Sequence, residues 1–231
     1  MFANVQIIQN AENRMKTLKQ AALALLFVPF MSCGGGAQKS TDSANEQSQA
    51  NKNQTIETIM SRRSIRQYKP QAVGRDTMQT IVECGINAPN GMNKQSWAIR
   101  VVDNPEYING ITEVFKKKNQ DRIANDPNFK NMFRNAPTVV FIANDSSYEL
   151  SQIDCGLLGE NMILAAQSMG IGSCCLGSPI RFMLTEPEAA EYVKRLELPE
   201  GYNLLYCIAF GHPDESPEAK PRDTSKIKFI D

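Results

Sequence analysis

The alternation of apolar and polar positions after residue 54 predicts helices interleaved with strands. Apolar residues between positions 157 and 169 lie on nearly every side of a helix predicted at residues 154–169, which is typical of a helix that is buried on all sides. Residues 76–88 instead carry apolar side chains at helical spacing, which indicates an amphipathic helix that ends before Pro89. The same patterns predict further helices at residues 55–60, 105–118 and 186–195, and strands at residues 98–102, 137–143, 173–176 and 203–210. Interleaved helices and strands indicate an α/β (α+β) layer protein.

The apolar segment 154–169 contains two glycines that need an explanation. A glycine inside a helix costs about 1 kcal/mol relative to Ala, so Gly156 and Gly159 indicate that another backbone or a ligand packs closely there. A well-packed core helix without a ligand is the alternative. Gly170 is a suitable C-terminal stop for this helix.

The first 33 residues have the composition of an export signal. Residues 15–33 contain two lysines, then an apolar core of about a dozen residues, and then Cys33. That core is too short to span a bilayer, which takes roughly 20 residues. The segment resembles a bacterial lipoprotein signal, which implies that Cys33 carries a lipid, that Met15 is the true start and that residues 1–14 are an upstream extension. A core helix of a cytoplasmic protein is the alternative.

Residues 34–54 are expected to form a flexible tether. They contain no apolar side chain larger than Ala, so they cannot bury enough surface to fold. A span of roughly 25 Å is enough to hold a domain clear of lipid headgroups. The chain is therefore expected to comprise a signal region at residues 1–33, the tether at residues 34–54 and one folded domain at residues 55–231. A lipid on Cys33 predicts location in the cell envelope, on the periplasmic side in a Gram-negative bacterium.

Composition excludes several classes of function. The 25 basic and 25 acidic residues balance, so nothing indicates a nucleic-acid partner. His212 is the one histidine and the six cysteines lack zinc spacing, so no metal site is expected. Cys174 and Cys175 are adjacent, so on a strand they point to opposite faces. Three further cysteines lie in apolar runs and are expected to be buried: Cys84, Cys155 and Cys207.

Two segments carry side chains that suit a ligand: one suits a phosphate group and the other suits a ring with polar edges. Three arginines and two serines lie between Ser61 and Arg66, and forked guanidinium groups and hydroxyls bind phosphate. Solvated surface arginines are the alternative. The loop of residues 90–97 is rich in Asn and Gln, whose amides suit a ring with alternating carbonyl and N–H groups. A turn that uses Asn90 and Gly91 for its backbone geometry is the alternative.

Four motifs in this order resemble the FMN-dependent nitroreductase family. The family's Arg-Arg-Ser-x-Arg-x-[Tyr/Phe] corresponds to RRSIRQY at residues 62–68, and its Ala-Pro-Ser-x-x-Asn-x-Gln-Pro-Trp corresponds to APNGMNKQSW at residues 88–97. Its Gly-x-Gly-Ser-Cys-x-x-Gly corresponds to GIGSCCLG at residues 170–177, and its last strand and basic pair correspond to GHP at residues 211–213 and KPR at residues 220–222. Asn90 and Ser96 depart from the family's Ser and Pro.

The resemblance implies a nitroreductase-like fold, with a mixed central sheet flanked by helices, in an intertwined homodimer with two FMN sites at the subunit interface. Groups implied to bind the FMN phosphate are Arg62, Ser64, Lys220 and Arg222, with Arg63 beside them. Arg66 is implied to lie near the pyrimidine edge of the flavin. Residues implied to come from the second subunit are Pro89, Asn90, Gly91, Asn93 and Gln95. Backbone N–H groups implied to lie near flavin N5 are those of Cys175, Leu176 and Gly177.

The resemblance also implies an oxidoreductase in which the flavin carries the chemistry and no protein acid or base is required. A donor, expected to be NAD(P)H, would transfer hydride to flavin N5 and leave before an electron-poor acceptor such as a nitroaromatic or a quinone binds. Gly156 and Gly159 would then lie where the same helix of the second subunit packs. One alternative is a thiol redox centre at Cys174 and Cys175. Another is an envelope-tethered flavin-binding module with a different reaction, or without NAD(P)H-linked turnover, because NAD(P)H is scarce outside the cytoplasm.

Overall fold

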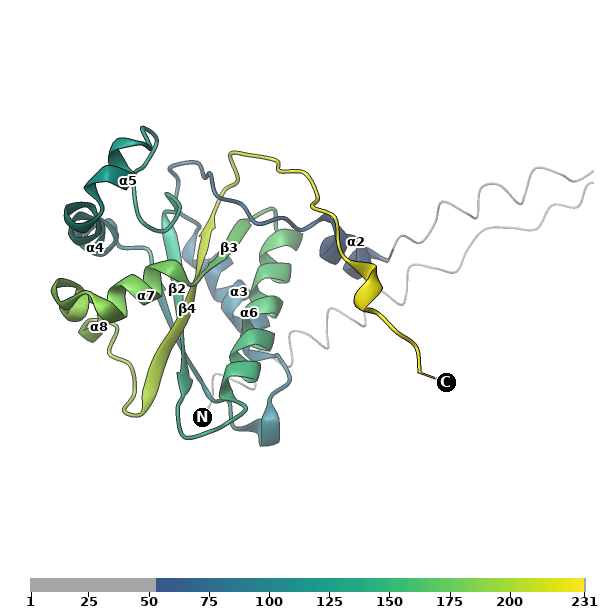
Figure 1. Ribbon diagram of the computed structural model, residues 1–231. Coiled ribbons are helices and arrows are strands. Elements are labelled where there is room, and N and C mark those ends of the chain that lie inside the picture. Colours follow the sequence, from purple (N-terminus) through teal and green to yellow (C-terminus); the bar gives the residue numbers. More distant parts are fainter. Residues whose placement is uncertain (1–52, 231) are drawn as a thin grey trace, which may run out of the picture. The chain divides into compact units, whose positions relative to one another are not determined.

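The computed structural model describes residues 53–230 (Figure 1). The predictions for residues 1–52, including the signal, the lipid on Cys33 and most of the tether, lie outside the described residues. The helices are α2 (Gln54–Ser61), α3 (Arg75–Ile86), α4 (Pro105–Lys118), α5 (Gln120–Ala124), α6 (Ser151–Ser168), α7 (Ser178–Thr185) and α8 (Ala190–Lys194). The strands are β1 (Trp97–Val102), β2 (Thr138–Asp145), β3 (Gly172–Leu176) and β4 (Tyr202–Gly211). Short 3₁₀ turns are η1 (Gly91–Asn93), η2 (Pro187–Ala189) and η3 (Thr224–Lys226).

The strands form one sheet in the order β1-β2-β4-β3, in which every neighbouring pair is antiparallel. The ladder between β2 and β4 pairs Thr138 with Phe210 and changes register after Ile142. Among the described residues, the parallel part of the expected mixed sheet is a single bridge between Ser64 and Ser173 at the outer edge of β3. The predicted α+β fold, with a central sheet flanked by helices, is confirmed.

Helices cover both faces of the sheet (Figure 1). Strand β2 is buried along almost its whole length because its alternating residues enter two different cores. Val139 and Phe141 belong to the core that also contains residues of α4 and α7. Val140 and Ile142 belong to the core that contains residues of α3 and α6. The continuous apolar run in β2 therefore reflects a strand that is covered on both faces.

Helix α6 is buried on one face and open on the other. Leu158 and Met162 are fully buried, whereas Ile153 is 60% exposed and Leu157 is 41% exposed. The prediction of a helix buried on all sides is therefore wrong for the single chain. The open face nevertheless carries the exposed apolar side chains of Ile153 and Leu157 beside the polar Gln152 and Glu160. Exposed apolar side chains that gather on one face often mark a surface that another molecule covers.

The two glycines of α6 have different surroundings. A Cβ atom at Gly159 would overlap Oη of Tyr206 in the same chain, where Tyr206 donates a hydrogen bond of 2.6 Å to the Cys155 carbonyl. The prediction that Gly159 contacts a second subunit is therefore wrong, because its small size accommodates Tyr206. A Cβ atom at Gly156 would meet nothing within 4 Å, so the corresponding statement for Gly156 stays a prediction.

The sequence pattern located all four strands and the helices α2, α3, α4 and α6, but it misjudged the short helices α5, α7 and α8. Helix α4 begins at Pro105 as predicted, and Asn104 caps it by accepting the Glu106 N–H at 2.8 Å. The pattern missed α5 and α7, and the helix predicted at residues 186–195 is η2 followed by the short α8. Cys84 is exposed on α3, which corrects its predicted burial, whereas Cys155 and Cys207 are buried as predicted. The described helices lack the combination of length and hydrophobicity that a membrane span requires.

Candidate functional site

The arginine-rich segment, residues 62–68, lies along the outer edge of β3. Ser64 forms a parallel bridge with Ser173, where the Ile65 N–H donates to the Ser173 carbonyl at 2.9 Å. Further along, Tyr68 bridges Pro213 just after the end of β4. Two motifs that are about 100 residues apart in the sequence therefore meet at one edge of the sheet.

The three arginines of this segment differ in what they contact. Arg63 Nη1 donates to the carbonyls of Met60 and Arg62, each at 2.8 Å, so it is engaged at the end of α2. Arg62 is half-buried at the C-terminal cap of α2. Arg66 is exposed, donates to the Ser64 carbonyl at 3.1 Å and lines a cavity. Arg62 and Arg66 are therefore better placed than Arg63 to bind an anion.

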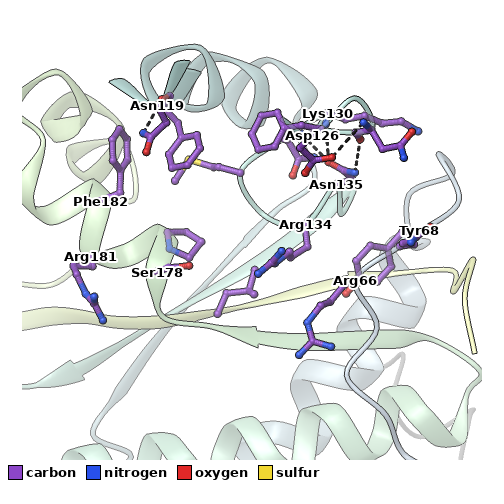
Figure 2. Close-up of a pocket in the computed structure, with 18 of the residues that line it drawn as sticks. Arg66, Tyr68, Asn119, Asp126, Lys130, Arg134, Asn135, Ser178, Arg181 and Phe182 are labelled. Carbon is purple, nitrogen blue, oxygen red and sulfur yellow. Dashed lines mark hydrogen bonds between the residues drawn. The ribbon is translucent and has the colours of Figure 1, made fainter. Parts of the chain in front are cut away.

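The cavity beside Arg66 has a volume of about 800 Å³, which is within the range of small-molecule sites (Figure 2). It lies between the arginine-rich segment, the loop of residues 126–135, α4 and the start of α7. Leu176 at the end of β3 and Ser178 at the start of α7 both line it. The end of β3 and the arginine-rich segment thus border the same space.

The turn from β3 into α7 offers backbone donors to this space. Gly177 is the residue before α7, and a Cβ atom there would meet nothing within 4 Å. The first N–H groups of a helix have no partner within the helix, so a ligand in the cavity can accept them. Cys175 is exposed and Cys174 is buried, which confirms that the two side chains point to opposite faces. The contact of the backbone N–H groups of residues 175–177 with flavin N5 stays a prediction, and it requires no particular side chain at these positions.

The adjacent thiols lack the features of a redox centre. Desolvation by the surrounding chain raises the pKa of the Cys175 thiol to about 11, although its side chain reaches the surface. Burial also raises the pKa of Cys174, despite the opposing effect of Arg66 and Arg134. Reactive cysteines instead have lowered pKa values. The raised pKa values of both thiols therefore give no support to a thiol redox centre.

The amide-rich loop, residues 89–96, has a strained backbone. Met92, Asn93 and Gln95 have φ values of 52°, 53° and 48°, in the left-handed region that residues other than glycine rarely adopt. Asn90 Oδ1 accepts the Gln95 N–H at 2.8 Å and closes the loop. Pro89 is exposed at its start. Strain of this kind persists only where the surrounding structure holds it.

Asp154 holds this loop against the first turn of α6. Asp154 is only 3% exposed. One of its carboxylate oxygens accepts the Gly91 N–H at 3.1 Å, and the other accepts the Ser96 hydroxyl at 2.8 Å. Ser96, which stands where the family has Pro, therefore has a partner that proline lacks. The sequence located Asp154 at a helix start but did not reveal this role, because its donors come from another segment.

The arginine-rich segment and the amide-rich loop lie at opposite ends of α6. Gly91 contacts Asp154 in the first turn, whereas Ser61, next to the arginines, accepts a hydrogen bond from Gln167 near the last turn. These two helix positions are about 20 Å apart at a rise of 1.5 Å per residue. A single chain therefore does not bring the amide-rich loop together with Arg62.

The basic pair after β4 is exposed. Arg222 Nη1 donates to the Lys220 carbonyl at 3.3 Å. The start of this tail follows the arginine-rich segment, since the Arg66 N–H donates to the Glu215 carboxylate. Within residues 53–230, no hydrogen bond or ion pair joins Lys220 or Arg222 to Arg62. Their grouping around one phosphate therefore stays a prediction.

A family model described as "Nitroreductase family" matches residues 59–212. The chain belongs to the nitroreductase family. The matched range includes the motifs at residues 62–68, 88–97 and 170–177, which carried most of the resemblance in the sequence, whereas the basic pair of residues 220–222 lies beyond it.

Individual members of the nitroreductase family are similar over most of the chain. An NADPH-flavin oxidoreductase of Vibrio harveyi is 30% identical over 176 residues, which are 74% of this chain and 70% of that protein. A nitroreductase with bound FMN from Bacteroides fragilis has 29% identity and a TM-score of 0.66, covering 78% of this chain and 100% of that one. An FMN-dependent nitroreductase from Clostridium difficile R20291 gives the same identity, TM-score and coverage.

The side chains of the described site fit FMN, the cofactor that the family implies. Arg62 and Arg66 supply cationic donors, the turn at Gly177 supplies backbone N–H groups, and the adjoining cavity is large enough for a ring system. Within residues 53–230 no group of three or more His, Cys, Asp or Glu side chains is arranged to hold a metal ion.

Two arginines of the cavity wall had not been named as site residues from the sequence. Arg134 and Arg181 both line the cavity, but neither lies in a motif of the nitroreductase family. The available signal was the pair of asparagines around Arg134, since Asn131 and Asn135 favour turns and left-handed backbone. That signal predicts a loop but gives no indication of what the loop faces.

Proposed function

We propose that this chain is an FMN-dependent oxidoreductase that transfers hydride from NAD(P)H, through flavin N5, to an electron-poor acceptor such as a nitroaromatic or a quinone. The observation that carries the proposal is the bridge between Ser64 and Ser173, which joins the arginine-rich segment to β3 beside a cavity of about 800 Å³. Family membership and the relatives, an NADPH-flavin oxidoreductase and nitroreductases with FMN, support it.

In this reaction the chain binds the flavin, orients its ring and supplies charge around it, while bound FMN supplies the hydride chemistry. The FMN phosphate would accept charge-assisted hydrogen bonds from the following groups: Arg62, Ser64, Lys220 and Arg222. Arg66 would lie at the pyrimidine edge, where a cation favours reduction because the electrons that the ring gains carry negative charge. Backbone N–H groups of residues 175–177 would orient the ring near N5.

We infer that the working unit is a homodimer. The amide-rich loop, with Asn90, Asn93 and Gln95, lies about 20 Å along α6 from the arginine-rich segment, so one complete site needs the loop of a second copy. The exposed apolar side chains of Ile153 and Leu157 on α6 and the open space over Gly156 support close packing of two such helices.

FMN binding by the purified full chain tests the cofactor directly. The protein should be yellow and should release FMN on denaturation. Arg62→Ala or Arg222→Ala should raise the FMN dissociation constant about tenfold to a hundredfold, since each removes charged hydrogen bonds. Arg75→Ala is the matched control, because Arg75 is exposed and pairs with Asp103 on the surface. A colourless protein that does not bind added FMN would contradict the proposal.

We also propose that a lipid on Cys33 tethers the domain to the cell envelope. The lysines, the apolar core and the Cys of residues 15–33, together with the polar tether that follows, support this location. Cells expressing the full gene should incorporate labelled palmitate into the protein and retain it in the membrane fraction. Cys33→Ser should abolish both, whereas Cys84→Ser, at an exposed cysteine, should change neither. Unlabelled protein in the soluble cytoplasmic fraction would reject this location.

An envelope location favours a second candidate function. Because NAD(P)H is scarce outside the cytoplasm, a tethered domain needs another electron source, another flavin reaction, or no turnover at all. The alternative is a flavin-binding module in the envelope, which binds FMN through the same residues but is not reduced by NADH or NADPH.

A further inference from the structure

The cavity next to the arginine-rich segment has a wall that the family motifs do not include. This wall is the loop of residues 126–135 together with α7. In Figure 2 the side chain of Arg134 lies between Arg66 on one side and Arg181 on the other. Arg66 and Arg134 are both close enough to Cys174, on β3, to affect the pKa of its thiol. Arg134 therefore lies near the edge of the sheet that would face the flavin.

The backbone at Arg134 is held in a strained conformation. Its φ is 59°, in the left-handed region, and Asn135 follows with a φ of 64°. Asn135 Oδ1 accepts the N–H groups of Lys130 and Asn131, at 2.7 Å and 3.0 Å, and Asn135 Nδ2 donates to the Asn128 carbonyl at 2.9 Å. Strained residues that are fixed in this way occur preferentially at ligand sites.

The second asparagine secures the other side of this loop. Asn131 Nδ2 donates to the Ala136 carbonyl at 3.0 Å, and Asn131 Oδ1 accepts the Phe133 N–H at 2.9 Å. Asn131 is buried, so these bonds are shielded from water. The loop therefore presents Arg134 to the cavity from a fixed backbone, which reduces the entropy lost when Arg134 binds a ligand.

The cations of this wall are not neutralised by ion pairs. Within residues 53–230 no carboxylate lies within ion-pair distance of Arg134, Arg181 or Lys130. Three acids also line the cavity, namely Asp126, Asp214 and Glu215. Asp126 accepts the Asn128 N–H at 3.2 Å and Glu215 accepts the Arg66 N–H, so both carboxylates have donors. The guanidinium groups of Arg134 and Arg181 are thus available to a ligand that carries negative charge.

The same wall has an aromatic part. The rings of Phe115 and Phe129 are stacked, with centroids 5.9 Å apart, and Phe182 meets Phe115 edge-on at 5.0 Å. All three line the cavity. Aromatic side chains beside guanidinium groups suit a ligand with a planar ring that bears an anionic group.

We propose that Arg134 and Arg181 form an anion subsite that selects, among the substrates of the flavin, a small aromatic compound with a carboxylate, sulfonate or phosphate group. The subsite rests on the proposed function, because the flavin would occupy the adjoining side of the cavity next to Arg66 and Leu176. It is distinct from the predicted phosphate site of FMN, whose cations are Arg62, Lys220 and Arg222.

Steady-state kinetics of the full chain with a matched pair of acceptors tests the subsite. Para-nitrobenzoate and para-nitrobenzamide have similar shape and differ in charge. In the unmodified protein kcat/KM should favour the benzoate. Arg134→Asn and Arg181→Gln should each lower the ratio of kcat/KM for benzoate over benzamide by about tenfold. Asn tolerates the left-handed backbone at position 134, and Arg134→Lys, which keeps the charge without the fork, should recover part of the ratio.

A second arm of the experiment identifies the source of the anion. The anionic group can belong to the acceptor or to the extra ribose phosphate of NADPH. A fall in the benzoate ratio assigns it to the acceptor, and a fall in the ratio of kcat/KM for NADPH over NADH assigns it to the donor. The first result supports the proposal, whereas the second keeps an anion site but overturns its assignment to a small aromatic acceptor. Arg75→Gln is the control outside the cavity and should leave both ratios unchanged.

Failure of the subsite is distinguishable from failure of the proposed function. If both variants retain FMN and turn over while neither ratio changes, the subsite is wrong and the oxidoreductase proposal stands. If the unmodified chain binds no FMN, or its flavin is reduced by neither cofactor, both proposals are wrong. FMN content and circular dichroism of each variant establish that a loss is not due to unfolding.

Discussion

The Ser96 hydroxyl donates a hydrogen bond of 2.8 Å to the buried carboxylate of Asp154, which ties the amide-rich loop to the first turn of α6. The other carboxylate oxygen accepts the Gly91 N–H at 3.1 Å. Asp154→Ala leaves both donors without their acceptor. We expect it to lower the free energy of unfolding by about 2–3 kcal/mol and to weaken FMN binding, as measured by urea denaturation and by flavin fluorescence.

Two other variants calibrate this effect. Ser96→Ala removes one of the two bonds and should cost about half as much. Asp76→Ala removes an exposed acid from the first turn of α3 and should cost less than about 1 kcal/mol. If Asp154→Ala is as stable and as fully flavinated as Asp76→Ala, then Asp154 does not hold the loop.

The glycines of α6 predict two separable defects. Gly159→Ala forces Tyr206 to move within the chain, so it should lower the free energy of unfolding by about 1–3 kcal/mol. Gly156→Leu adds a side chain where the single chain has open space, so the monomer should fold normally. It should instead weaken the dimer and reduce FMN content, measured by analytical ultracentrifugation and absorbance. A dimeric, fully flavinated Gly156→Leu variant would place the subunit contact elsewhere.

The Cys175 thiol predicts a distinctive pH dependence. Its pKa is raised from an ordinary value of 9.0 to about 11, so it should react slowly with iodoacetamide at neutral pH and faster towards pH 11, as measured site by site with mass spectrometry. Between these two values the unfolded chain loses a proton that the folded chain keeps. The contribution of Cys175 to stability is therefore complete below about pH 9 and declines as the pH rises to about 11.

Turnover provides the control for the thiol. If the flavin carries the chemistry, Cys175→Ser should retain NAD(P)H oxidation, because only the backbone of residue 175 is expected to meet the ring. Rapid alkylation of Cys175 at pH 7 that abolishes turnover would instead favour a thiol centre.

Elements whose signal is local could be predicted from the sequence. The alternating residues of β2 enter two cores, so both faces of the strand are buried and its sequence is a continuous apolar run. The start of α4 is marked by two adjacent residues, the cap Asn104 and then Pro105, so the signal is local in the sequence. The resemblance implied that the arginine-rich segment and residues 175–177 both contact FMN, and the bridge between Ser64 and Ser173 brings these two segments together.

Features that depend on partners distant in sequence could not be predicted. The small size of Gly159 is explained by Tyr206, which lies on β4, and nothing near Gly159 in the sequence indicates it. The burial of Asp154 depends on donors from the loop before β1. Cys84 lies in an apolar run, but the helix turns it outward. The cavity wall around Arg134 follows from loop geometry rather than from a periodic pattern.

Anaerobic stopped-flow absorbance of the FMN-loaded full chain tests the central claim most directly. Mixing with NADH or NADPH should bleach the flavin, and a second mixing with a nitroaromatic or a quinone should restore the colour without oxygen. Such a result separates an oxidoreductase from a flavin-binding module with the same cofactor residues. A chain that binds FMN but is bleached by neither NADH nor NADPH would contradict the account.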